Sequence, residues 1–160
     1  MKKLLVLVFA IALCLGVLCV GASADHIITL EEPKKGTGSP EDPYKIEIVG
    51  HLYWFADYVN DGHPNACAVM TQDIYINVNV LLSNGNLNDV PPNEWIPINN
   101  FSGTFDGQGY TIHGLYLSDT SDGNSSDPGG YYYTGMFRDV SGTVKNLKLE
   151  DSYVAGEFTK

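Results

Sequence analysis

Four oxygen-bearing side chains that could bind a metal ion lie close together in the sequence. They are Asp119, Asp122, Asn124 and Asp127, and Ca²⁺ takes about six to eight oxygen ligands of this kind. Their spacing matches neither an EF-hand loop nor the calcium-binding nonapeptide repeat. Because the stretch 118–130 contains no apolar side chain that could enter a core, we favour an exposed acidic loop over a Ca²⁺ site and expect no cofactor.

Two histidines and a cysteine suggest zinc, because imidazole and thiolate are its usual ligands. His51 falls in a predicted helix, whereas His63 and Cys67 follow that helix. No fourth ligand is apparent, so we do not expect a zinc site. The sequence also contains no His-Glu-x-x-His, the motif of many zinc peptidases.

Paired carboxylates could cleave a glycosidic bond, which requires two of them at a defined separation. Asp73 and Asp106 are the candidates because each lies next to a predicted strand. However, Asp106-Gly107 is typical of a turn, and no second carboxylate is placed on the same face. No serine stands in a Gly-x-Ser-x-Gly motif. We therefore predict that the chain is not an enzyme.

Tyrosines supply the main candidate binding surface. Tyr75 and Tyr116 occupy the same outward position of two strands that we expect to be aligned, and Tyr131, Tyr132 and Tyr133 follow the polar loop. Exposed aromatic rings of this kind suit sugar rings or a partner protein. The alternative is that the rings pack on one another and stiffen the protein, as cross-strand pairs do.

An internal repeat predicts the elements that position these side chains. Residues Ser102–Asp119 match Thr134–Asp151 at one constant offset and without a gap; we call this the long match. The leucines that alternate with other residues in the two copies are Leu115, Leu117, Leu147 and Leu149. This alternation predicts strands with the leucines facing inward. Similarity at one offset of about 20–50 residues is typical of stacked repeats, so we expect parallel strands.

These stretches resemble a known family. FSGTFDGQGYTIHGLYL, followed by GMFRDVSGTVKNLKLED, is similar to the GLUG-motif repeat of secreted microbial surface proteins, and residues 36–62 resemble the family's lead-in segment. The resemblance covers Gly36–Val154. It implies an all-β fold, a short right-handed parallel β-helix (solenoid) with an N-terminal strand-plus-helix cap. It also implies that Asp73 binds turn amides. Such repeats are found in adhesins, in stalks and beside metallopeptidases.

Four segments are predicted along the chain. They are a signal peptide at 1–24, an extended leader at 25–43, an N-terminal cap at 44–62, and β-helix coils at 63–160 that are incomplete at the C-terminus. The signal peptide has two lysines, a long apolar run and Ala22-Ser23-Ala24 before the cleavage point. In the cap, Tyr44–Ile48 alternates as a strand, and Val49–Asn60 has the apolar period of a helix that covers the open end of the first coil.

Net charge, the signal peptide and the cysteine content limit the possible binding partners, the cellular location and the possible disulfides. The formal net charge is −10, and so acidic a chain repels phosphate backbones, which excludes nucleic acid as a partner. A cleaved signal peptide implies a secreted or cell-surface protein without stable membrane insertion. After cleavage Cys67 is the remaining cysteine, so we expect no disulfide within the chain.

These observations predict a non-catalytic structural or adhesive module of a secreted or cell-surface microbial protein. Its partner would be a protein or glycan on a host or neighbouring cell, or a second copy joined through the uncapped C-terminal end. Two alternatives stay open. One is a β-helix that binds or degrades polysaccharide, and the other is the accessory N-terminal region of a longer secreted metallopeptidase.

Overall fold

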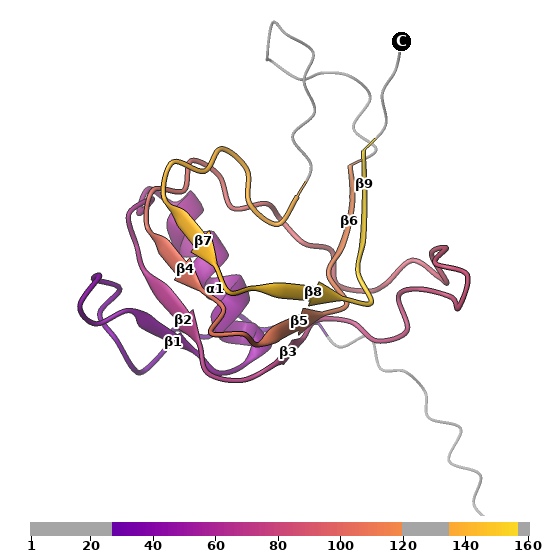
Figure 1. Cartoon of the computed structure of the whole chain (residues 1–160), viewed down its shortest axis with the longest axis horizontal. Coiled ribbons are helices and arrows are strands. Elements are labelled where there is room, and N and C mark those ends of the chain that lie inside the picture. The colour runs from indigo at the N-terminus through magenta and orange to yellow at the C-terminus, as the bar shows by residue number, and fades with distance from the viewer. Residues whose placement is uncertain (1–26, 120–134, 157–160) are drawn as a thin grey trace, which may run out of the picture.

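The computed structural model describes residues 27–119 and 135–156, which contain one helix and nine short strands (Figure 1). In chain order the elements are β1 (Tyr44–Ile46), α1 (Val49–Asn60), β2 (Ala68–Met70), β3 (Ile74–Tyr75), β4 (Thr104–Asp106), β5 (Thr111–His113), β6 (Tyr116–Asp119), β7 (Thr143–Lys145), β8 (Lys148–Glu150) and β9 (Tyr153–Gly156). The predicted signal peptide and most of the predicted polar loop lie outside the described residues.

The strands form three parallel sheets. One sheet has the order β1-β2-β4-β7, the second β3-β5-β8, and the third β6-β9. From β2 onward, consecutive strands of the chain enter different sheets, and β7, β8 and β9 repeat the order of β4, β5 and β6 beside them (Figure 1). We call β2–β3 the first coil, β4–β6 the second coil and β7–β9 the third coil. The prediction of a mainly β fold with parallel strands is confirmed.

Alternate side chains along these strands enter one apolar core. In the second sheet, Ile74 and Ile112 pair in register and are both buried, whereas the neighbouring Tyr75 is exposed. Leu115 and Leu117 of the second coil are also buried, as their alternation predicts. Because apolar burial contributes about 25 cal/mol per Å², this shared core is the main source of stability.

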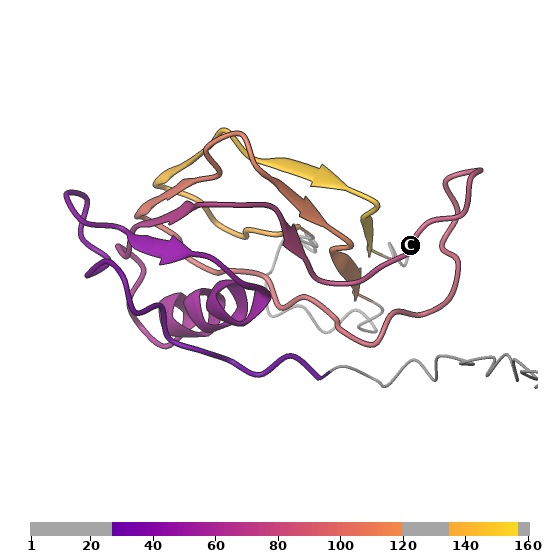
Figure 2. The ribbon, with the colours of Figure 1, turned by 90° about the horizontal axis from the view of Figure 1, so that it is seen from below.

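The helix α1 lies at one end of the stack, next to β1 (Figure 2). It has the predicted bounds, Val49–Asn60, and its apolar stripe faces the core. The ring of Phe55 lies 6.2 Å from that of Phe101 and 5.8 Å from that of Phe105, measured between centroids. The helix therefore packs directly on the segment that leads into the second coil.

The segment before β1 packs against the same end of the molecule. The N–H of Glu31 donates to the carbonyl of Gly50, and the N–H of Lys45 donates to the carbonyl of Lys35. From residue 27 to β1 the segment forms neither a helix nor a strand. Its backbone is nevertheless held beside α1 and β1 by these hydrogen bonds.

The register of the third coil differs from that of the long match. The long match sets Ser102 against Thr134 and therefore Leu115 against Leu147. In the structure Thr104 pairs with Thr143, and Ile112 pairs with Leu149. The offset also changes along the coil, because residues 107–110 join β4 to β5 but only residues 146–147 join β7 to β8. The predicted alignment of Leu115 with Leu147 is therefore wrong.

The third coil is also less buried than the repeat predicts. Leu147 is partly buried and Leu149 is 43% exposed. Leu149 pairs with the fully buried Ile112, so both lie at the same register position. Leu149 is exposed because no strand among the described residues pairs with the outer edge of β8.

The segment between β3 and β4 is mostly irregular. β3 ends at Tyr75, and residues 94–98 contribute an isolated bridge between Ile98 and Phe137. Trp95 anchors this segment in the core, because its side chain is 1% exposed and its Nε1 donates to the carbonyl of Met136.

Candidate functional site

The outward face of the second sheet carries three side chains in register. They are Tyr75 of β3, His113 of β5 and Glu150 of β8, and backbone pairing joins Tyr75 to His113 and His113 to Glu150. We call them the outer row. Their direction follows from the alternation of side chains along each strand, because the preceding residues Ile74 and Ile112 are buried in the core.

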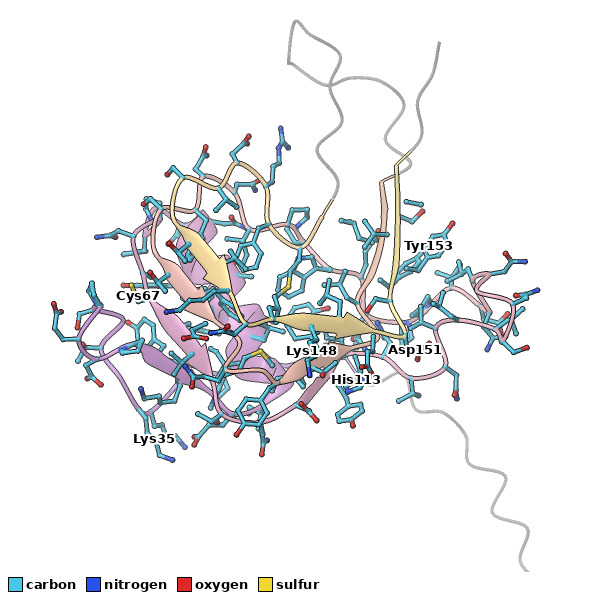
Figure 3. The ribbon with its side chains drawn as sticks, viewed as in Figure 1. Lys35, Cys67, His113, Lys148, Asp151 and Tyr153 are labelled. Carbon is cyan, nitrogen blue, oxygen red and sulfur yellow. The ribbon has the colours of Figure 1, made fainter. Side chains whose placement is uncertain are left out.

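The outer row is preassembled by contacts between its own members. The ring of Tyr75 stacks on the imidazole of His113, with 4.4 Å between centroids and 5° between planes. His113 Nδ1 lies 3.8 Å from Glu150 Oε2. Tyr75 is 59% exposed, so an incoming molecule could contact the aromatic ring and hydrogen-bond the carboxylate together. Figure 3 shows His113 on the same side of this sheet as Lys148.

The prediction that Tyr75 and Tyr116 occupy the same outward position of two aligned strands is wrong. Tyr116 belongs to β6, in a different sheet from β3, and is 7% exposed. Its ring stacks on that of Tyr153, with 6.1 Å between centroids, which matches the alternative of rings that pack on one another. The other predicted tyrosines, Tyr131, Tyr132 and Tyr133, lie outside the described residues.

Sequence reasoning missed His113 and Glu150 because it aligned the strands at the wrong offset. One signal could have found His113. Ile74-Tyr75 and Ile112-His113 have the same order of an aliphatic and an aromatic residue, and the structure pairs the two dipeptides in register. No comparable pattern in the sequence marks Glu150.

The two candidate catalytic carboxylates hold corners of the stack. Asp73 Oδ1 accepts a hydrogen bond of 2.8 Å from the N–H of Thr111. Asp106 accepts hydrogen bonds from the N–H of Gln108, at 2.9 Å, and from Nδ2 of Asn146, at 3.0 Å. Burial raises the pKa of Asp106, but these hydrogen bonds and the nearby Lys145 ammonium outweigh it and leave the pKa below its ordinary value.

The residues weighed as zinc ligands have separate partners. His51 Nδ1 accepts from the N–H of Glu47, at 3.2 Å, and His63 stacks on Tyr58. Cys67 is buried with its Sγ 3.7 Å from the carbonyl of Asn65. In residues 27–119 and 135–156, no three His, Cys, Asp or Glu side chains are grouped to hold a metal ion. Of the residues weighed for Ca²⁺, Asp122, Asn124, Asp127 and the side chain of Asp119 lie outside what the structure describes.

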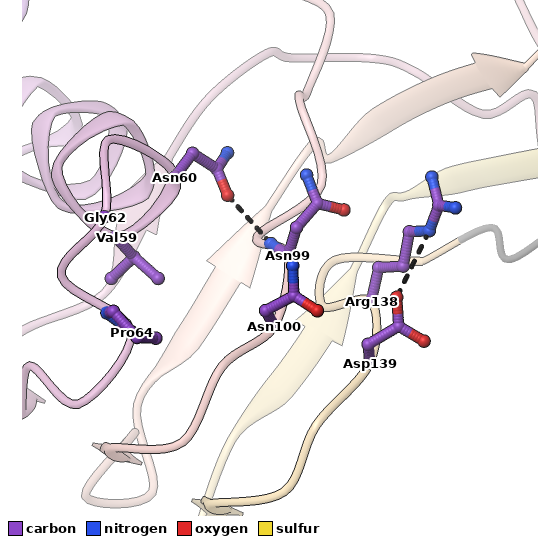
Figure 4. A pocket seen from close by; sticks show the side chains of 8 residues that line it. All are labelled: Val59, Asn60, Gly62, Pro64, Asn99, Asn100, Arg138 and Asp139. Atoms are coloured by element: carbon purple, nitrogen blue, oxygen red, sulfur yellow. Dashed lines mark hydrogen bonds and ion pairs between the residues drawn. The ribbon is translucent and has the colours of Figure 1, made fainter.

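A polar cleft of about 480 Å³ opens where the end of α1 meets the second and third coils (Figure 4). Its lining consists of Val59, Asn60, Gly62, Pro64, Asn99, Asn100, Arg138 and Asp139. Asn60 Oδ1 accepts from the N–H of Asn99 at 2.8 Å, and Arg138 Nε lies 3.5 Å from Asp139 Oδ2. The cleft offers hydrogen bonds but is not lined by an aromatic ring, so the outer row is the stronger candidate for a sugar ring.

A relative of this chain is found in Evansella cellulosilytica. The chain is 32% identical over 128 residues to that organism's "Putative Gly-rich membrane protein", and the alignment covers 76% of this chain and 12% of the relative. This chain therefore spans about an eighth of the relative's length. No family model matches the chain, and no solved structure matches it. Within the described ranges no helix has the length and apolar character needed to cross a membrane.

Proposed function

We propose that this chain is a non-catalytic structural and adhesive module of a secreted or cell-surface microbial protein. In this proposal the three parallel sheets are the faces of a short right-handed parallel β-helix of the GLUG type. The stacked coils supply a stiff body, and the outer row supplies the contact surface. The observation that carries the proposal is the row itself, in which Tyr75, His113 and Glu150 are held in register on paired strands.

The chemistry of the outer row favours a glycan as the partner. An aromatic ring provides apolar contact for the C–H face of a sugar, and a carboxylate accepts hydrogen bonds from its hydroxyl groups. Tyr75 and His113 are already stacked, so their side chains lose little rotamer freedom when a ligand binds. A site of three side chains is small, and we expect a dissociation constant of about 1 mM for one site.

A surface location rests on two observations. The predicted signal peptide at 1–24 would direct the chain out of the cytoplasm. The relative's name describes a membrane protein, which is compatible with attachment of such modules to a cell surface.

A glycan array tests this proposal. The wild-type chain should bind a subset of glycans without releasing cleavage products. Tyr75→Ala and His113→Ala should each weaken that binding by about tenfold, because each removes a stacked ring (a loss of about 1.4 kcal/mol). His63→Ala is a matched control, because His63 also stacks on a tyrosine, Tyr58, with centroids 3.8 Å apart but near the end of α1.

Three outcomes would contradict parts of the proposal. Equal loss of binding in His63→Ala would mean that the outer row is not the contact surface. Cleavage products would support the alternative of a polysaccharide-degrading enzyme. Absence of binding to glycans and to cell-surface proteins would leave a stalk without adhesive activity.

A further inference from the structure

The third coil presents an apolar edge that the described residues leave uncovered. β7, β8 and β9 are each the last strand of their sheet. Leu149 and Val154 are each 43% exposed, whereas the residues paired with them in the second coil, Ile112 and Leu117, are 0% and 5% exposed. The third coil buries the second coil, and a further layer of strands would bury the third coil in the same way.

Hydrogen bonds to the second coil identify the backbone groups that face the open edge. The N–H of Lys148 donates to the carbonyl of Tyr110, and the carbonyl of Glu150 accepts from the N–H of Gly114. Neighbouring residues of a strand direct their N–H and C=O groups to opposite edges. Both backbone groups of Leu149, which stands between Lys148 and Glu150, therefore point away from the second coil.

The strands on either side of β8 follow the same pattern. The N–H groups of Thr143 in β7 and Tyr153 in β9 both donate to carbonyls of the second coil. The following residues, Val144 and Val154, therefore direct their backbone groups to the open edge. Val144 precedes Leu149 by as many positions as Val154 follows it, so the three open positions are symmetric about Leu149.

This symmetry fits a second copy of the same chain. We propose that two copies pair head to head, with β8 antiparallel to β8 of the partner subunit around a two-fold axis at Leu149. The same axis sets Val144 opposite Val154 of the partner subunit, so β7 pairs with the partner's β9. Figure 1 shows β7 and β9 on opposite sides of β8, as this axis requires. Each pair of residues at the open positions can then exchange two backbone hydrogen bonds.

In this arrangement the charges of β8 complement those of β8 in the partner subunit. β8 reads Lys148-Leu149-Glu150, so antiparallel pairing at Leu149 sets Lys148 opposite Glu150 of the partner subunit, twice in each dimer. Opposite charges at directly opposed positions stabilise strand pairing. In the described part of the chain, Lys148 makes no ion pair, and Glu150 Oε2 lies 3.8 Å from His113 Nδ1. The side chain of Lys148 is visible on the third coil in Figure 3.

The oligomeric state of the full chain, produced with its own N-terminal segment, tests this proposal. Sedimentation velocity should show a dimer. Lys148→Glu creates Glu-Leu-Glu and Glu150→Lys creates Lys-Leu-Lys, and each sets like charges opposite one another. Each variant should raise the dimer dissociation constant about tenfold or more. An equimolar mixture of the two variants should recover the dimer, because unlike charges then face one another at both positions.

Two controls separate loss of pairing from loss of folding. Lys34→Glu reverses an exposed charge in the segment before β1 and should remain a dimer. All variants should keep the wild-type circular dichroism spectrum. A wild-type monomer at about 100 μM, a mixture that stays monomeric, or an open fibre would each overturn the proposal. The readout needs no glycan, so it is independent of the proposed adhesive function.

Discussion

Replacing Leu115 by alanine should destabilise the protein far more than replacing Leu147 by alanine. Leu115 lies in the core between β5 and β6, with no exposed surface. Leu147 lies in the short connection between β7 and β8 and is partly buried. The long match makes these two leucines equivalent, whereas the strand pairing does not. The difference between the two substitutions in lost unfolding free energy is therefore a direct test of the register.

The magnitude follows from their surroundings. Leu115→Ala removes about three buried carbons, worth about 0.8 kcal/mol each, and the residual cavity brings the expected loss of unfolding free energy to about 3 kcal/mol. Leu147 borders an open hollow of about 430 Å³ that Gln108 and Lys148 also line. Its replacement leaves no closed cavity, so we expect a loss of about 1 kcal/mol.

Urea unfolding, followed by the fluorescence of Trp54 and Trp95, which both pack in or against the core, measures both losses. With a slope of about 1.5 kcal/mol per molar urea, the expected difference of about 2 kcal/mol separates the two midpoints by about 1.3 M. Leu82→Ala is the control, because Leu82 is 45% exposed and lies in the loop after β3. Midpoints for Leu115→Ala and Leu147→Ala that coincide would refute the register described here.

Two further predictions concern the corners of the stack. A Cβ on Gly142 would overlap the carbonyl oxygen of Gly103 in the neighbouring coil. Gly142→Ala should therefore lower the free energy of unfolding by about 2 kcal/mol or more. A Cβ on Gly85 would meet no atom within 4 Å, but Gly85 has a φ of +83°. Gly85→Ala should therefore lower the free energy of unfolding by about 1 kcal/mol in the same urea titration. The pKa of Asp106 is lower in the folded state than in the unfolded chain. The stability that ionised Asp106 contributes is therefore complete above about pH 4, and it is lost as the pH falls through the folded-state pKa. Asp106→Asn should therefore be less stable than the wild type at pH 7, with a gap that narrows at about pH 2.5; an equal gap at both pH values would contradict this.

Local periodicity was sufficient to predict the helix and the faces of the strands. α1 occupies the predicted Val49–Asn60 because its apolar residues recur at helical spacing and pack on the core. The outward direction of Tyr75 and the inward direction of Leu115 follow from alternation along a strand. These features depend on residues that are close in the sequence.

The register could not be predicted from the number of matching residues. Ser102-Gly103-Thr104 recurs as Ser141-Gly142-Thr143, and this shorter match coincides with the observed pairing of β4 with β7. The long match contains more identities but ignores the length of the corner. Strand pairing depends on backbone hydrogen bonds, and a change in corner length shifts every later residue.

One corner has a positive φ without the glycine that would mark it in the sequence, because tertiary hydrogen bonds stabilise it. Gly114 and Asp151 stand at corresponding corners of the second and third coils, with φ of 74° and 47°. Glycine adopts this conformation without strain, whereas aspartate requires compensation. Asp151 Oδ1 accepts from the N–H of Leu81 at 2.9 Å, and Oδ2 accepts from the N–H of Val80 at 3.1 Å. Both partners belong to the loop after β3, far earlier in the chain, so the sequence alone did not mark the corner.

The proposed pairing of two copies would also change how the outer row binds. β8 is the last strand of its three-stranded sheet, so pairing at Leu149 would join two such sheets into one continuous sheet. Both copies of Tyr75, His113 and Glu150 would then lie on a single outward face. Two weak sites on one rigid body bind a dense glycan surface far more tightly than one site, because the second contact forms at a high effective concentration. A monomeric variant such as Lys148→Glu would keep the affinity of a single site and lose this gain, so avidity and contact chemistry can be measured separately.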